Sequence, residues 1–186
     1  MENTSESTYS YFSHLHNYAV WTAARAAQRG FTTTKNIQAA IDKTNLRRLL
    51  EGEISISDKE EFDRFHVKCC KQIMEKLEHS LGDNPSKVTF GRAAKIVNIY
   101  IKTAIVIPQP DSQLAFIAHP PVDRILLIGL TEQLKVKFHK ISWTGFDQKD
   151  YLEIITQFRG LGFGIELPFW KIEEYWNLVR ETEADI

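Results

Sequence analysis

Three polar side chains interrupt the most apolar stretch of the chain. Lys95, Asn98 and Lys102 lie within residues 91–107, where most of the other positions are apolar. Spacings of three and four residues place side chains one above another on a helix. This stripe either reaches the surface between neighbouring helices or lines a cleft. Its three residues are therefore candidates for binding a ligand or a nucleic acid.

A second group has the spacing of metal ligands. His66, Cys69 and Cys70 would lie on one face of a helix. Structural zinc needs four ligands and catalytic zinc at least three, and the sequence has no second pair that completes such a set. Cys69 also falls on the apolar face of its helix, so we expect a buried thiol and no metal site. We expect no cofactor, because the glycine-rich connector 160–164 lacks the preceding strand and the Lys-Ser/Thr pair of a phosphate-binding loop.

Two short stretches carry a resemblance to a known family. The sequence FGRAAK at 90–95, followed by Val122-Asp123 at the start of a later helix, resembles the helix-hairpin-helix DNA glycosylases over about 35 residues. In that family a glycine-rich hairpin holds DNA phosphate through backbone amides, and an aspartate at the start of a following helix assists attack on the sugar. Gly91 and Arg92 match the end of the hairpin, and Asp123 matches the aspartate.

The resemblance implies a role for each matching residue. Asp123 would activate water or stabilise the oxocarbenium-like sugar, with His119 nearby. The polar stripe would face the phosphate backbone or the pocket, and Trp21 would stack on a flipped base. The sequence departs from the family where Val88-Thr89 replaces the Pro-Gly of the hairpin and Ala93 occupies the place of a lysine. An enzyme of this kind would hydrolyse an N-glycosidic bond.

The elements that must position these residues are helices. Apolar periodicity and capping residues predict the ranges 9–28, 35–43, 45–50, 57–81, 91–107, 121–130, 147–158 and 168–181. A strand competes only weakly, at 135–141. Because helix 91–107 is apolar nearly all round, it belongs in the middle of the core. We therefore expect an all-α fold, a single-domain orthogonal array of about seven or eight helices around this central helix, spanning residues 9–186 after a frayed segment 1–8.

Two local expectations concern the first and fourth helices. On the first, Phe12, Leu15 and Ala19 belong to the apolar stripe, while Trp21 and Arg25 share another side with Tyr18. We favour a partly buried ion pair for Arg25, which also stays a candidate for binding a ligand or a nucleic acid. On the fourth, the run Ser57-Asp58-Lys59-Glu60 predicts a capping box with Ser57 as the N-cap.

Net charge, hydropathy and cysteine content bear on whether the chain binds nucleic acid, enters a membrane or is secreted. The 186 residues carry a net charge of −1, so no global positive field indicates nucleic acid or an anionic membrane surface. The N-terminus has no basic and apolar segments of a secretory signal, and no apolar run is long enough to span a membrane. The two cysteines are adjacent and form no disulfide framework, which favours a cytoplasmic location.

No complete catalytic set emerges from these residues. The best interpretation is a cytoplasmic helical binding module, whose aromatic C-terminal region and proline-rich loop 108–121 bind another protein or a second copy of the chain. The alternative is a DNA-binding enzyme of the glycosylase type, acting on a damaged or flipped base.

Overall fold

The described part of the chain is helical. The computed structural model describes residues 9–82 and 87–176, so the expected fraying of residues 1–8 and the end of the last expected helix lie outside them. Within these two ranges there is no strand, only a single bridge between Phe163 and Leu167. The prediction of an all-α fold is confirmed.

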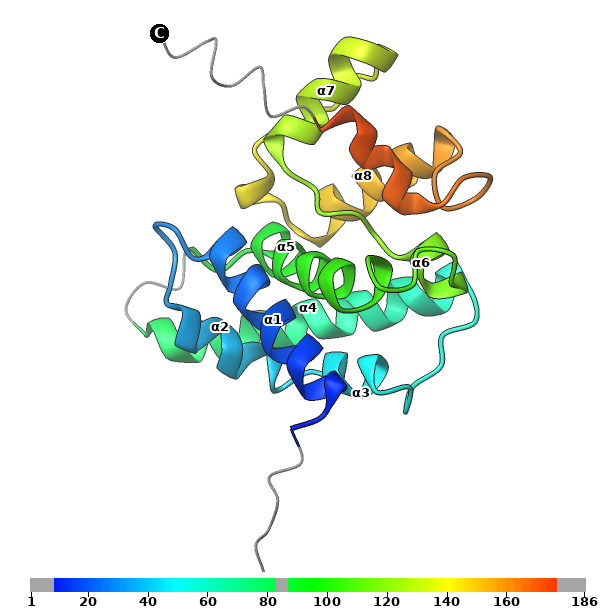
Figure 1. The fold of residues 1–186 in the computed structure, drawn as a ribbon. Helices are drawn as coiled ribbons and strands as arrows, with labels where there is room; N and C mark the ends of the chain where they lie inside the picture. Colours follow the sequence, from blue (N-terminus) through cyan, green and yellow to red (C-terminus); the bar gives the residue numbers. More distant parts are fainter. Residues whose placement is uncertain (1–8, 83–86, 177–186) are drawn as a thin grey trace, which may run out of the picture.

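The described residues form eight α-helices together with three π- or 3₁₀-helical segments (Figure 1). In chain order the elements are α1 (Tyr11–Ala27), α2 (Thr34–Ile41), α3 (Leu46–Leu50), α4 (Lys59–Leu81), α5 (Phe90–Ile101), the π-helical turn η2 (Lys102–Val106), α6 (Gln113–Ile117), α7 (Arg124–Leu134), the 3₁₀ turn η3 (Trp143–Gly145), α8 (Gln148–Gly160) and the 3₁₀ helix η4 (Phe169–Tyr175).

Helix α5 lies at the centre, as its apolar surface predicts. It packs against α1 and α4 in the N-terminal half and against α8 and η3 in the C-terminal half. Figure 1 shows α5 crossing behind α1 and below α7 and α8. Ile96, Val97, Tyr100 and Ile101 are all 0% exposed. Because α5 contacts both halves, it joins them through one core.

Side-chain caps set the starts of most helices. An oxygen of the N-cap residue accepts a hydrogen bond from a backbone N–H of the first turn, which satisfies an otherwise unpaired donor. The residues that cap in this way are Ser10, Thr33, Asp58, Thr89, Ser112, Asp123 and Asp147. The cap of α4 is Asp58, one residue later than predicted. Glu61, and not Glu60, reaches back to the N–H and hydroxyl of Ser57.

The orientation of α1 differs from the prediction. Phe12 is 43% exposed and Arg25 is exposed, whereas His16 is buried and its Nδ1 lies 2.9 Å from the Tyr100 hydroxyl. Alanines on several sides of α1 leave its rotation ambiguous from sequence, and the His16–Tyr100 bond fixes it. The predicted buried ion pair of Arg25 is therefore wrong.

Segment 108–121 is not a continuous loop. It contains the short helix α6, capped by Ser112, and it packs on the core through Ala115 and Ile117. Ahead of it, α5 continues into the π-helical turn η2, which ends before Pro108. Among the described residues no helix is both long and apolar enough to span a bilayer.

Two glycines permit unusually close backbone packing. A Cβ on Gly91 would lie 1.9 Å from the carbonyl oxygen of Trp143, and one on Gly129 would lie 1.9 Å from that of Tyr175. Both distances are far inside van der Waals contact. Glycine at these positions lets η3 and η4 lie directly against α5 and α7.

Candidate functional site

The polar stripe of α5 neither lines a cleft nor reaches water along most of its length. Lys95 is 8% exposed and Asn98 is 1% exposed. Lys95 Nζ lies 2.8 Å from Asp123 Oδ2, and Lys102 pairs with Glu173. The stripe is covered by the C-terminal half of the chain and bonds to it.

Asn98 is the middle of a buried hydrogen-bond network. Its Nδ2 donates to the Pro120 carbonyl and to the Tyr151 hydroxyl, each at 2.9 Å. Its Oδ1 lies 2.8 Å from His66 Nε2. The His66 ring stacks on Tyr151, with ring centroids 5.1 Å apart and planes 7° from parallel. One carboxamide thus connects α4, α5, the segment before α7, and α8.

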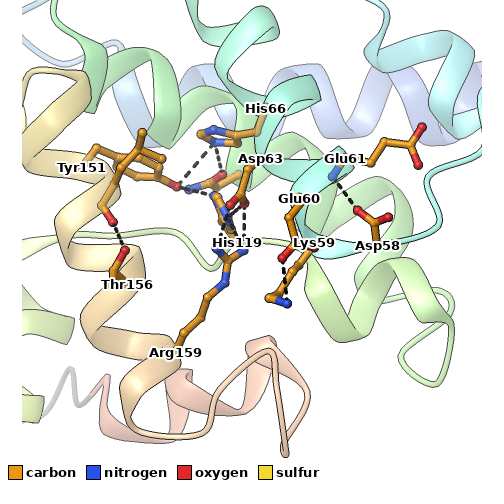
Figure 2. A network of polar contacts seen from close by, with 12 residues as sticks. Asp58, Lys59, Glu60, Glu61, Asp63, His66, His119, Tyr151, Thr156 and Arg159 are labelled. Carbon is orange, nitrogen blue, oxygen red and sulfur yellow. Dashed lines mark hydrogen bonds and ion pairs between the residues drawn. The ribbon is translucent and has the colours of Figure 1, made fainter.

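The network continues from Tyr151 towards the surface (Figure 2). The Tyr151 hydroxyl lies 3.1 Å from His119 Nδ1, and His119 Nε2 lies 2.8 Å from Asp63 Oδ1. Arg159 donates to both oxygens of Asp63, at 2.7 and 2.8 Å. This bidentate pair closes the outer end, where the Asp63 side chain is 26% exposed.

The donor and acceptor groups at the outer end determine which atom carries the proton in each hydrogen bond of the network. Arg159 donates only, so the ionised Asp63 accepts, and His119 Nε2–H must donate to it. His119 Nδ1 then accepts from the Tyr151 O–H, and the tyrosine oxygen accepts from Asn98. Asn98 Oδ1 in turn accepts from His66 Nε2–H. His66 Nδ1 is left to accept from the Cys70 thiol, whose sulfur lies 3.7 Å away. Every one of these polar side chains has a partner.

Burial and charge set the protonation states of the network. Burial lowers the pKa of His66 and of His119, which favours the neutral form of both imidazoles. Burial alone would raise the pKa of Asp63, but hydrogen bonds from Arg159 and His119 outweigh it and hold that pKa below its usual value. Burial also raises the pKa of the Cys70 thiol. A protonated, buried thiol is a poor nucleophile.

Asp123 and His119 take part in two separate groups of contacts. Asp123 is the N-cap of α7, where its Oδ1 accepts from the Leu126 N–H at 3.0 Å. It also accepts from Lys95 and from Trp176 Nε1, the latter at 3.1 Å to both oxygens. His119 faces Tyr151 and Asp63 instead. The two residues that the resemblance pairs as catalytic thus have different partners.

The hairpin positions named by the resemblance are also engaged inside the fold. The Gly91 N–H donates to the Phe146 carbonyl at 3.0 Å, and the Arg92 N–H donates to the cap oxygen of Thr89. Neither amide is free to hold a phosphate. The Arg92 guanidinium lies over the Phe31 ring, 4.6 Å from its centroid, and is partly exposed.

Of the sequence candidates, Trp21 and Arg25 are the two that lie on the outside. Trp21 is 52% exposed, and its ring stacks on that of Tyr18, which is 54% exposed, with centroids 5.8 Å apart and planes 23° from parallel. Tyr11, 65% exposed, lies on the same side of α1. We call the exposed residues Tyr11, His14, Tyr18, Trp21 and Arg25 the α1 face.

The aromatic C-terminal region is mostly core. The side chains of Phe146, Tyr151, Phe158, Phe163 and Phe169 are buried. Trp176 is 37% exposed, and Ile165 and Leu167 are the other exposed apolar side chains of this region within the described residues. The region thus presents fewer exposed rings than α1.

Sequence reasoning missed three members of the network: Asp63, Tyr151 and Arg159. Asp63 and Arg159 are separated by 96 positions, and Tyr151 and His66 by 85. No motif links them, and only their contacts in the fold identify them. Within the two described ranges, no three His, Cys, Asp or Glu side chains are grouped so that they could hold a metal ion.

No family model matches this chain, and no curated protein or solved structure is significantly similar to it. The fold and the site therefore define the class only as an all-α domain built around a buried polar network.

Replacing Asn98 with alanine should strongly destabilise the fold. The change removes three hydrogen bonds: the Pro120 carbonyl loses this donor, and His66 and Tyr151 each lose one partner, at a cost of about 3 kcal/mol. Urea denaturation followed by circular dichroism measures this loss. Asn17→Ala, an exposed mid-helix change of the same chemistry, should alter the free energy of unfolding by less than about 0.5 kcal/mol. Equal losses in the two variants would contradict the central role of Asn98.

Stability should decrease in mild acid. His66 and His119 have lowered pKa values in the folded state, so below the usual value of 6.5 the unfolded chain takes up protons that the folded chain does not. Each imidazole then removes up to about 1.4 kcal/mol per pH unit. Thermal unfolding measured from pH 7.5 to 5 checks the slope. The exposed His79→Gln variant should keep it, and a flat profile in the native chain would mean that both rings take up protons equally in the folded and unfolded states.

Proposed function

We propose that this chain is a helical binding module that holds an extended polyanion across the α1 face and the turn after α1. The observation that carries the proposal is the row of exposed aromatic side chains on α1. Tyr11, Tyr18 and Trp21 are each more than half exposed, and no described element covers them. Large exposed rings at regular spacing mark an interaction surface more often than a solvated one.

The charge around this face favours an anionic partner. Residues 7–41 and 87–110 contain no aspartate or glutamate, yet they hold seven of the chain's 23 lysines and arginines. The two segments pack together through α1 and α5. Lys95 and Lys102 of the second segment are paired inside the fold, so the others supply the outer charge. A nearly neutral protein thus has a local basic surface.

Five cations surround the C-terminal end of α1. Among the described residues Arg25, Arg29 and Lys35 have no ion-pair partner. Lys87 Nζ lies 3.0 Å from the Gly30 carbonyl, and the Arg92 guanidinium lies over Phe31. Figure 1 shows the turn between α1 and α2 beside the start of α5.

The interior offers no comparable site. Apart from Arg159 Nε, which has no hydrogen-bond partner, the polar groups of the network bond to one another, and His66, Asn98 and Tyr151 are each no more than 1% exposed. Four surface grooves over the described residues have volumes of 360 to 660 Å³, and neither Lys95 nor Asp123 lines any of these four. Two buried free thiols, Cys69 and Cys70, fit the cytoplasmic setting that we propose for the module.

Removing charge beside the α1 face should weaken binding to a polyanion. We expect the native chain to bind heparin, and the Arg25→Gln/Arg29→Gln double variant to elute from a heparin column at clearly lower salt, because fewer counterions are released. The matched control is Lys71→Gln/Lys149→Gln, which removes two exposed charges from α4 and α8. Failure of the native chain to bind at low salt, or an equal shift in both variants, would overturn the proposal.

The second candidate is the glycosylase-type enzyme. The observation in its favour is the contact between Lys95 Nζ and Asp123 Oδ2, which joins the two stretches of the resemblance at 2.8 Å. The Asp123 side chain is only 16% exposed, and the Trp176 indole bonds to both of its oxygens. Attack by water on a nucleotide sugar at this place requires Trp176 to move away.

An excision assay separates the two candidates. We expect no base release from oligonucleotides containing uracil or an alkylated purine, measured as strand breaks after alkali, because the Asp123 carboxylate is held by three donors. Excision that Asp123→Asn abolishes, with unchanged circular dichroism, would replace the binding module with the enzyme. Asp58→Asn is the matched control, since it changes another N-cap aspartate.

A further inference from the structure

Tyr18 and Trp21 on the α1 face form an exposed aromatic stack, which we call the platform. Both rings are more than half exposed, and they lie 23° from parallel with centroids 5.8 Å apart. The spacing of three residues brings them to the same side of the helix. A planar partner can extend such a stack of exposed rings, and nucleobases stack on tyrosine and tryptophan whatever their sequence.

Cations continue the line of the platform. Arg25 follows Trp21 by four residues on the same side of α1, and Arg29 lies in the turn just after the helix ends at Ala27. Lys87 and Arg92 then lie at the turn that Gly30 and Phe31 form. From Tyr11 to Arg25 the helix rises about 21 Å, which is long enough for several nucleotides.

From this order of rings and charges we infer that the polyanion is single-stranded nucleic acid. The inference rests on the proposed function and names its partner. Bases stack on Tyr18 and Trp21 while phosphates follow Arg25, Arg29 and the turn. A duplex does not fit this surface, because its base faces are already stacked and only its edges and backbone are exposed. A polyanion without planar groups would use the cations and leave the rings unused.

The platform explains a feature that charge alone does not. An electrostatic surface needs lysine and arginine, whereas exposed tyrosine and tryptophan cost solvation and favour aggregation unless a partner covers them. Arginine beside an aromatic platform also adds a cation–π contribution to a stacked base. The combination on one side of one helix is typical of single-strand binding surfaces.

The test measures binding of fluorescein-labelled oligothymidylate to the full chain by anisotropy at low salt. We expect binding that weakens steeply with salt, together with quenching of tryptophan fluorescence on addition of oligothymidylate but not of heparin. Trp21→Ala should weaken oligothymidylate binding by about tenfold, in the range that the loss of one stacked base gives, and Trp21→Phe should largely retain it. Neither change should alter heparin binding.

Ile165→Ala is the matched control, because Ile165 is 53% exposed on the C-terminal half and its loss should change nothing. Circular dichroism of each variant checks the fold. Heparin binding without any effect of Trp21→Ala on oligothymidylate would overturn this inference and leave the proposed function standing. If the native chain binds neither heparin nor oligothymidylate, both this inference and the proposed function are overturned. Binding to a duplex, to anionic lipid vesicles or to polyglutamate that is tighter than binding to oligothymidylate would also overturn this inference.

Discussion

The carboxamide of Asn98 is the interaction on which the two halves of the molecule depend. It lies in the middle of the most apolar helix, where an unpaired amide would cost several kcal/mol. Its donors and its acceptor are used by groups from α4, α8 and the segment before α7. The polar stripe of α5 therefore joins the N-terminal and C-terminal halves of the molecule through hydrogen bonds and ion pairs. Because these bonds are directional, they fix how the C-terminal helices lie on α5 more closely than apolar packing alone would.

Much of the fold is predictable from local patterns. The central position of α5 follows from residues such as Ile96 and Val97, which give it an apolar surface on nearly every side. The starts of helices follow from capping side chains such as Asp123. The rotation of α1 is not predictable in this way, because alanines are compatible with several orientations. It is decided by the long-range contact between His16 and Tyr100.

The candidate sites were harder to predict, for two different physical reasons. Inside, a polar residue such as Asn98 gives the same local pattern whether it meets a ligand or another side chain, and its partners come from distant parts of the sequence. Outside, Trp21 was identified only through the resemblance, and Arg25 was assigned to the core. A signal was present in the uneven distribution of charge, since residues 7–41 contain no carboxylate side chain. Net charge over the whole chain conceals that asymmetry.

The close approach at Gly91 and Gly129 has a consequence for how this sequence tolerates change over evolutionary time. Any side chain at either position would collide with a main-chain carbonyl, and a carbonyl has no alternative rotamer. Substitutions on the surface of α1 or α8 leave the fold intact, whereas a substitution of either glycine must displace the whole segment that packs against it. Distant relatives should therefore diverge least where they have no side chain at all.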